Sequence, residues 1–233
     1  MSQHPIELHI RPTPNSYKIS IFLEEAGLPY EVKLVNISTG EQFKPDFLNI
    51  APNNRMPAIV DPDGPDGQPI SVFESGAILQ YLGRKTGKFY PADERNRVTV
   101  DQWLMWQMGG LGPMCGQAHH FRIYAPEQIE YAINRYTNEV NRLYGVLNRQ
   151  LAGKEYVCGE YSIADMASFP WVRPWERQGQ NLADFPHLKA WFERMGGRPG
   201  VQRGLNLAKE QQDTANIAID KEAQKVLFGQ RAR

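Results

Sequence analysis

The feature that most constrains the fold of this chain is the order in which strand and helix signals follow one another along the sequence. Over roughly the first 85 residues, short runs with alternating apolar side chains, typical of strands, take turns with runs whose apolar residues recur at helical spacing. Strands are expected at 6–10, 30–37, 57–60 and 70–73, and helices between Asn15 and Gly27, at 44–50 and at 75–85. A turn rich in Asp, Gly and Pro at 61–68 separates the last two strands and predicts a hairpin.

Strand, helix, strand, helix, hairpin and helix is the arrangement of an α/β thioredoxin-like domain, which we expect over residues 1–87. Beyond a linker ending at Asp93, strand signals vanish and helices are expected at 94–107, from Pro126 to about Leu151, after a capping-box pattern at Ser162-Ile163-Ala164-Asp165, and at 184–195. Residues 109–113 (Gly-Gly-Leu-Gly-Pro) predict a break in a helix. The second domain, 94–233, is therefore all-helical, with a polar C-terminal extension from about Asn206 that ends in a short helix near 226–228.

Composition argues against several classes of partner. The 233 residues carry 26 Lys and Arg against 26 Asp and Glu, with no basic run, so neither nucleic acid nor an anionic membrane is expected as a partner. No secretory signal and no apolar run near the ~20 residues of a membrane span is visible. Two cysteines, Cys115 and Cys158, lie far apart, so a reducing cytoplasm is expected. His119 and His120 are adjacent rather than spaced i, i+4, so no metal is expected.

Three short motifs stand where a strand-like run meets a helix or a tight turn. They are Thr13-Pro14-Asn15, Met56-Pro57 and Glu74-Ser75. A turn that opens a helix presents free backbone N–H groups and a partial positive charge, which suits an anion or a thiolate. Together the three motifs predict one small polar ligand that is held largely by the backbone.

Each motif also has a simpler interpretation. The first can be only a turn and a helix cap, with Asn15 or Ser16 as the N-cap. Met56-Pro57 can be an ordinary entry into a strand, or a cis peptide that turns its backbone groups toward a peptide ligand. Glu74 and Ser75 can cap the next helix, or can bind the ammonium and carboxylate of an amino-acid head group. The residues alone leave these alternatives open.

The motifs and long stretches of the helical half resemble the nu-class glutathione transferases, bacterial and fungal relatives of the yeast nitrogen-regulatory prion protein. Residues 107–114, 117–121 and 161–165 carry the most specific part of this resemblance, which covers nearly the whole chain. It implies the glutathione transferase fold, a homodimer, and either two reduced glutathione molecules or one glutathione disulfide in each site.

The resemblance also implies roles for individual residues. It places Thr13 and Asn15 as catalytic residues beside the glutathione sulfur, where their donors would favour the thiolate. The implied glutathione-binding residues are Gln42, Asn54, Met56 beside cis-Pro57, Glu74 and Ser75 at the γ-glutamyl end, and Arg135 for the second molecule.

The function that these features predict is glutathione-dependent reduction of small disulfides by a bound glutathione thiolate. No cysteine stands at the position of Thr13, which excludes a covalent mixed disulfide there. Conjugation of glutathione to electrophiles, or reduction of organic hydroperoxides, is the alternative; it would need an apolar pocket between Trp103 and Phe121. A non-enzymatic glutathione-binding regulatory module ranks third, because no Gln/Asn-rich segment precedes Ile6.

Overall fold

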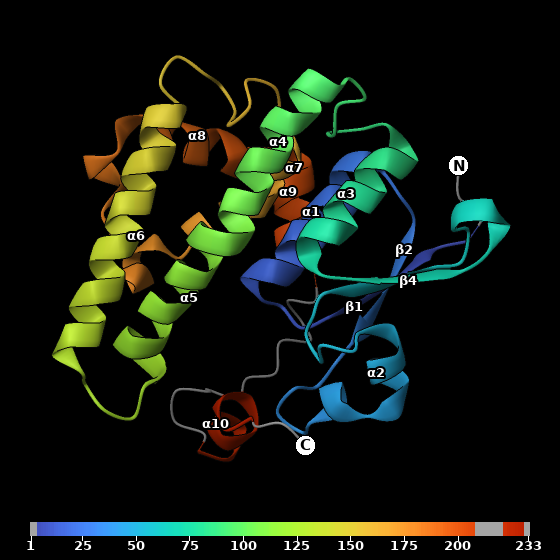
Figure 1. Cartoon of the computed structure of the whole chain (residues 1–233), viewed down its shortest axis with the longest axis horizontal. Coiled ribbons are helices and arrows are strands. Elements are labelled where there is room, and N and C mark those ends of the chain that lie inside the picture. Colours follow the sequence, from blue (N-terminus) through green and yellow to red (C-terminus); the bar gives the residue numbers. More distant parts are fainter. Residues whose placement is uncertain (1–3, 208–220, 231–233) are drawn as a thin grey trace.

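The structure, a computed structural model, describes residues 4–207 and 221–230. Its N-terminal part is a four-stranded mixed sheet in the order β2-β1-β3-β4, in which β1 pairs parallel with β2 and antiparallel with β3. The strands are β1 (Ile6–Ile10), β2 (Tyr30–Leu34), β3 (Ala58–Asp61) and β4 (Ile70–Phe73). Figure 1 shows α1 (Pro14–Ala26) and α3 (Ser75–Thr86) on one side of this sheet and α2 (Pro45–Ile50) on the other. The thioredoxin-like prediction is confirmed.

Strand β2 is shorter than the sequence predicts, because it ends at Leu34 rather than at residue 37. Asn36 explains the early end. Its side-chain oxygen accepts a hydrogen bond from the Ser38 N–H at 3.0 Å, which makes a local turn. The Asn36 N–H is taken in turn by the Glu41 carboxylate at 2.7 Å, so it is not available to a neighbouring strand.

The second part is all-helical, as predicted, but its first helix does not break at the glycines. α4 (Glu94–Trp106) runs without interruption through a π turn, η3 (Gln107–Leu111), into α5 (Gly112–His119) and a second π turn, η4 (His120–Tyr124). The expected break is therefore wrong. A π turn already departs from the regular hydrogen-bond ladder, so Pro113, which has no N–H to donate, follows it without ending the helix.

The remaining helices differ from the prediction mainly at their ends. The long helix α6 begins at Glu130 rather than at Pro126, and leaves Ile129 exposed as its N-cap. The capping box at Ser162 is confirmed: its hydroxyl and the Asp165 carboxylate bond reciprocally to backbone N–H groups at the start of α7. A helix after Pro199 was not predicted. These elements are α6 (Glu130–Gln150), α7 (Ile163–Val172), α8 (Pro186–Gly196), α9 (Pro199–Asn206) and α10 (Lys221–Phe228).

The short C-terminal helix is longer than expected and packs back on the fold. Its Phe228 ring lies 4.9 Å from the ring of His120 and 6.2 Å from that of Tyr124, centroid to centroid. The rest of the predicted extension, 208–220 and 231–233, lies outside the described residues. The boundary between the two domains at 87 and 94 stays a prediction; α3 ends at Thr86 and α4 begins at Glu94.

Helix α1 joins the sheet to the helical part, because α7 and α9 pack on it from the other side. The approach of α9 is close: a methyl group on Gly204 would lie 2.7 Å from the backbone nitrogen of Ile21. Arg198, just before α9, binds both oxygens of Glu25 on α1, at 3.0 and 2.7 Å. The position of α1 is therefore fixed by both parts of the molecule.

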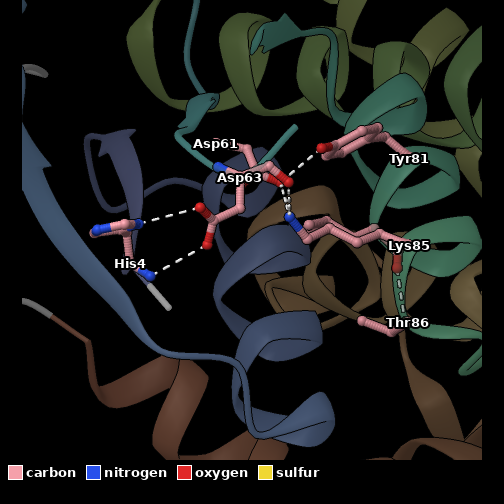
Figure 2. Close-up of polar contacts among 7 residues, drawn as sticks. His4, Asp61, Asp63, Tyr81, Lys85 and Thr86 are labelled. Carbon is pink, nitrogen blue, oxygen red and sulfur yellow. Dashed lines mark hydrogen bonds and ion pairs between the residues drawn. The ribbon is translucent and has the colours of Figure 1, made fainter. Parts of the chain in front are cut away.

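A buried polar cluster fixes the far end of the sheet (Figure 2). Asp61, the last residue of β3, is fully buried and accepts hydrogen bonds from the Tyr81 hydroxyl at 2.6 Å and from the Lys85 ammonium. Lys85 also donates to the Asp63 carbonyl at 2.7 Å. The cluster ties the β3–β4 hairpin to α3. None of the described helices is both long and apolar enough to cross a membrane.

Candidate functional site

The three motifs singled out in the sequence meet in one pocket. Its volume is about 270 Å³, and it opens where the N-terminus of α1, the start of β3 and the start of α3 come together. The residues that line it are Asn15, Arg55, Met56, Pro57, Phe73, Glu74 and Ser75. Arg55 places a cation in the lining, although the sequence pattern assigns it no role. Residues of all three motifs therefore line a single pocket, which is where the predicted small polar ligand would bind.

At the first motif the helix cap is Thr13, not Asn15 or Ser16. Thr13 has extended backbone angles, φ −140° and ψ 161°, and its hydroxyl oxygen accepts from the Ser16 N–H at 3.4 Å. Pro14 occupies the first helical turn, where a missing N–H costs little. The cap leaves Asn15 at the helix N-terminus with its side chain in the pocket lining, while Thr13 is not among the lining residues.

A residue far along the chain orients Asn15. The indole N–H of Trp171, on α7, donates to the side-chain oxygen of Asn15 at 2.8 Å. Because the oxygen of an amide lies opposite its nitrogen, this bond turns the two amide hydrogens of Asn15 away from Trp171. Asn15 is therefore presented as a donor at the positive end of α1, which suits an anionic sulfur. The separation of 156 residues explains why sequence reasoning missed this contact.

The peptide bond between Met56 and Pro57 is cis, as the resemblance implies. Both residues line the pocket. Asn54, two residues earlier, has a positive φ of 48°, a conformation that asparagine tolerates better than most residues.

Glu74 stands at the N-cap position of α3 but does not cap it with its side chain. Its backbone is unusual for a residue with a side chain, with φ 66° and ψ 116°. Its carboxylate accepts from the Asn53 amide at 3.3 Å and lines the pocket, so the capping interpretation fails for its side chain. Ser75, the first residue of α3, lies almost fully buried beside it.

Behind Ser75 lies a buried lysine that the sequence pattern did not reveal. The ammonium of Lys18, on α1, donates to the Ser75 hydroxyl oxygen at 3.3 Å and to the Gln107 side-chain oxygen at 2.7 Å. It also lies 3.5 Å from the Met108 sulfur. Burial lowers the pKa of Lys18 to about 7, and the nearby charge of Glu74 opposes that shift. Lysine in an amphipathic helix is normally expected at the surface, so its side-chain type gave no signal.

Besides Thr13, three predicted residues do not line the pocket. Gln42 is buried in η1 (Glu41–Phe43), where its amide donates to the Ile37 carbonyl at 3.4 Å. Gln42 and Asn54 each hold a buried side-chain oxygen without a hydrogen-bond partner among the described residues. Arg135 lies on α6 with its side chain 57% exposed, 3.8 Å from the Glu139 carboxylate. The roles of these three residues stay predictions.

Neither cysteine has the environment of a reactive thiolate. Cys115 is fully buried, and burial raises its pKa. Cys158 is half-buried, and burial raises its pKa to about 12. Both thiols are therefore protonated at neutral pH. Among the described residues, no cluster of three or more His, Cys, Asp or Glu side chains offers a metal site.

Comparison with known proteins relates the chain to one family. The family model described as "Glutathione S-transferase, N-terminal domain" matches residues 6–84, and "Glutathione S-transferase, C-terminal domain" matches residues 109–199. The chain is 52% identical over 202 residues to the disulfide-bond oxidoreductase YfcG of Escherichia coli, an alignment that covers 86% of this chain and 94% of the relative. It is 40% identical to YghU, a second disulfide-bond oxidoreductase of Escherichia coli, over 88% of this chain and 75% of the relative.

Two solved structures are similar over most of their length. A glutathione transferase from Burkholderia graminis, with two glutathione molecules bound per subunit, has a TM-score of 0.84 and 46% identity, covering 88% of this chain and 89% of its own. A glutathione transferase from Pseudomonas putida, with one glutathione disulfide bound per subunit, has a TM-score of 0.82 and 45% identity, covering 87% and 91%.

Proposed function

The chain belongs to the glutathione S-transferase family, and from that premise we propose that it is a nu-class enzyme that reduces small disulfides with glutathione. The observation that carries this proposal is the pocket itself, in which Asn15 presents amide hydrogens at a helix N-terminus. None of the described residues lining that pocket is a cysteine. The site is thus suited to bind and activate the thiolate of a ligand and has no thiolate of its own. The oxidoreductase names of two relatives point to the same chemistry.

In the proposed reaction, a bound glutathione thiolate attacks one sulfur of a disulfide. A mixed disulfide forms, and the other half of the substrate leaves as a thiolate that takes up a proton. The thiolate of a second glutathione then attacks the glutathione sulfur of the mixed disulfide, which releases the second substrate thiol. The products are one glutathione disulfide and two thiols, so the electrons come entirely from glutathione.

The protein contributes orientation and control of the thiol pKa. Thr13 and Asn15 are assigned to the sulfur, because both stand at the N-terminus of α1 where a negative charge is favoured. Met56 and cis-Pro57 are assigned to the cysteinyl backbone, and Glu74 and Ser75 to the ammonium and carboxylate of the γ-glutamyl end. Gln42 and Asn54 are further contacts in this proposal, and Arg135 belongs to a second glutathione.

The proposal extends to the assembly and the setting. Two reduced glutathione molecules or one glutathione disulfide occupy each site, as in the similar structures from Burkholderia graminis and Pseudomonas putida. The active form in this proposal is a homodimer in the cytoplasm. Reduced glutathione is available in that compartment, and cysteines stay reduced there.

The test is the rate of glutathione-dependent reduction of 2-hydroxyethyl disulfide, coupled to glutathione reductase. The double variant Cys115→Ala/Cys158→Ala should retain most of the wild-type rate, because no protein thiol takes part. Asn15→Asp should be much slower, because it keeps an oxygen for Trp171 but replaces the amide donor with a second oxygen that repels the thiolate.

A wild-type rate no faster than the uncatalysed exchange would refute disulfide reduction. Glutathione conjugation and peroxide reduction would then be assayed with the same preparation. Loss of activity in the cysteine-free variant, with its fold intact, would refute the mechanism even if the wild-type enzyme is active.

A further inference from the structure

Lys18 is an unusual residue for a protein interior, because only 1% of its surface is exposed. It lies where α1, α3 and the π turn η3 meet, and the groups around its ammonium are neutral: the Ser75 hydroxyl, the Gln107 amide and the Met108 sulfur. No ion pair to Lys18 occurs in the described part of the chain. A buried ammonium with no carboxylate within hydrogen-bond distance is costly, so an anion that binds nearby would favour the charged form of Lys18.

The route to such a partner leads through Ser75. Its hydroxyl oxygen accepts from Lys18, and Ser75 lines the pocket. In the empty site the Ser75 hydroxyl donates to the Met108 sulfur, a weak acceptor 3.6 Å away, so its hydrogen can turn to a stronger acceptor in the pocket. A hydroxyl polarised by an ammonium is a better donor to an anion. Ser75 therefore offers a hydrogen-bond donor to the pocket, and the Lys18 ammonium lies directly behind it.

We propose that Lys18 is a positioning residue for the carboxylate of the γ-glutamyl arm, that it acts through Ser75, and that it takes up a proton when this carboxylate binds. The proposal rests on the proposed function, since it assumes that glutathione occupies the pocket with its γ-glutamyl end at Glu74 and Ser75. It adds a role for a residue of α1 that no part of the motif pattern indicates.

The electrostatic argument follows from burial. With a pKa of about 7, Lys18 is partly neutral in the empty protein at neutral pH. An incoming carboxylate favours the ammonium, because opposite charges interact strongly where water is excluded. Among the described residues, Glu74, at the N-cap of α3, is the group whose charge acts on Lys18 in the empty site. The other charged groups brought to α1 are engaged elsewhere: Asp165 with Trp191, Arg173 over the Tyr17 ring, Arg198 with Glu25 and Arg203 with Glu24.

The Gln107 contact adds a link between the two parts of the fold. Gln107 is fully buried in η3, and its oxygen lies 2.7 Å from the Lys18 ammonium, the shortest of the three contacts. The wide turn of η3 thus brings a residue of the helical part to the γ-glutamyl end of the pocket. Its amide nitrogen has no hydrogen-bond partner among the described residues.

The experiment is calorimetric binding of S-methylglutathione at pH 6.5 to 8.5, repeated in buffers of different ionisation enthalpy to count the protons taken up. The methyl group removes the thiol, so the sulfur does not titrate. Wild type should take up a fraction of a proton, largest between pH 7 and 8. Lys18→Met should abolish that uptake and weaken binding at pH 7 by about 10-fold, the equivalent of one pKa unit.

Two controls separate this role from a structural one. Lys88→Met changes the lysine that donates to the Ala26 carbonyl at the opposite end of α1, and should alter neither uptake nor affinity. The second control is a ligand: S-methylglutathione in which a hydrogen replaces the γ-glutamyl carboxylate, so that its amine is a simple alkylamine that stays protonated from pH 6.5 to 8.5. Wild type should bind this decarboxylated ligand without proton uptake, and Lys18→Met should bind it as wild type does.

The inference is wrong if wild type takes up as many protons with the decarboxylated ligand as with S-methylglutathione, a comparison that needs no variant. It is also wrong if Lys18→Met weakens both ligands equally. If wild type binds neither ligand nor glutathione, the proposed function itself fails; if it binds them and Lys18→Met leaves uptake unchanged, only the role of Lys18 fails.

Discussion

Replacing Trp171 by phenylalanine would test whether the helical part of the molecule orients a residue of the pocket that we propose for glutathione. The substitution keeps an aromatic ring but removes the N–H that donates to the Asn15 oxygen at 2.8 Å. A net hydrogen bond of this kind contributes roughly 1 kcal/mol. Without it the two orientations of the Asn15 amide become similar in energy, and one of them presents an oxygen to the thiolate.

The expected loss can be bounded from both sides. A bias of roughly 1 kcal/mol keeps about 85% of the amides in the donating orientation, and two orientations of equal energy leave about 50%, so kcat/KM should fall by about 2-fold. Complete removal of the donor by Asn15→Ala sets the upper limit, since a hydrogen bond to a charged group contributes about 1.5–3 kcal/mol, or about 10- to 150-fold. We therefore expect Trp171→Phe to lose about 2-fold in disulfide reduction, well below the loss from Asn15→Ala, and to raise the pKa of the bound glutathione thiol, which is read from its thiolate absorbance.

A double-mutant cycle decides whether Trp171 acts through Asn15. In the Asn15→Ala background, Trp171→Phe should cost little further, because no amide remains to be oriented. Trp175→Phe, in the neighbouring η5 (Trp175–Gln178), is the matched control and should leave the rate unchanged. Additive losses from Asn15→Ala and Trp171→Phe would refute the orienting role and leave Trp171 as a packing residue.

Three further predictions concern stability. Asp61→Asn should lower the free energy of unfolding by about 3 kcal/mol in denaturant titrations, because it leaves the buried end of Lys85 without its carboxylate, whereas Asp66→Asn in the exposed turn should change it by less than about 0.5 kcal/mol; equal effects would contradict this. Gly204→Ala should lower the melting temperature, because its methyl group would lie 2.7 Å from the Ile21 nitrogen. Gly196→Ala is the control and should not lower it, because its methyl group would lie 4.0 Å from the Phe169 ring. An unchanged melting temperature for Gly204→Ala would show that α9 can shift away from α1. The pKa of Lys18 falls to about 7 in the folded protein, so above pH 7 the unfolded chain binds one more proton than the folded chain does. Ligand-free wild type should therefore gain free energy of unfolding relative to Lys18→Met from pH 7 to 9, by at most about 1.4 kcal/mol per pH unit. A constant difference between the two proteins would show that Lys18 does not titrate in this range.

The local pattern of the chain predicted the strands and most of the helices, because each depends on neighbours within a few residues. The hairpin between β3 and β4 and the capping box at Ser162 are examples. The same reasoning failed at residues 109–113, where glycine and proline are usually breakers. There the π turn and the packing of Gly112 close to the Gln107 side chain, not propensity, decide the outcome.

The pocket was predictable only as far as its own motifs extend. Asn15, Met56 and Glu74 were found because each sits in a recognisable junction. Their supports were not found, because a hydrogen bond between Trp171 and Asn15, or between Lys18 and Gln107, spans 156 or 89 residues and leaves no periodic trace in the sequence. Contacts of this kind are decided by tertiary packing.

The bond from Trp171 to Asn15 and the contact of Gln107 with Lys18 have a consequence for how such proteins can be recombined. A chimera that joins residues 1–87 to the helical half of a distant relative would keep every side chain that lines the pocket. It would lose the Trp171 indole and the Gln107 amide, which contact Asn15 and Lys18, unless the relative that supplies the helical half has the same residues at the matching positions. We therefore expect a chimera to keep its activity only when the helical half provides equivalents of Trp171 and Gln107. The two halves then form one functional unit, although the pocket is lined by the N-terminal half alone.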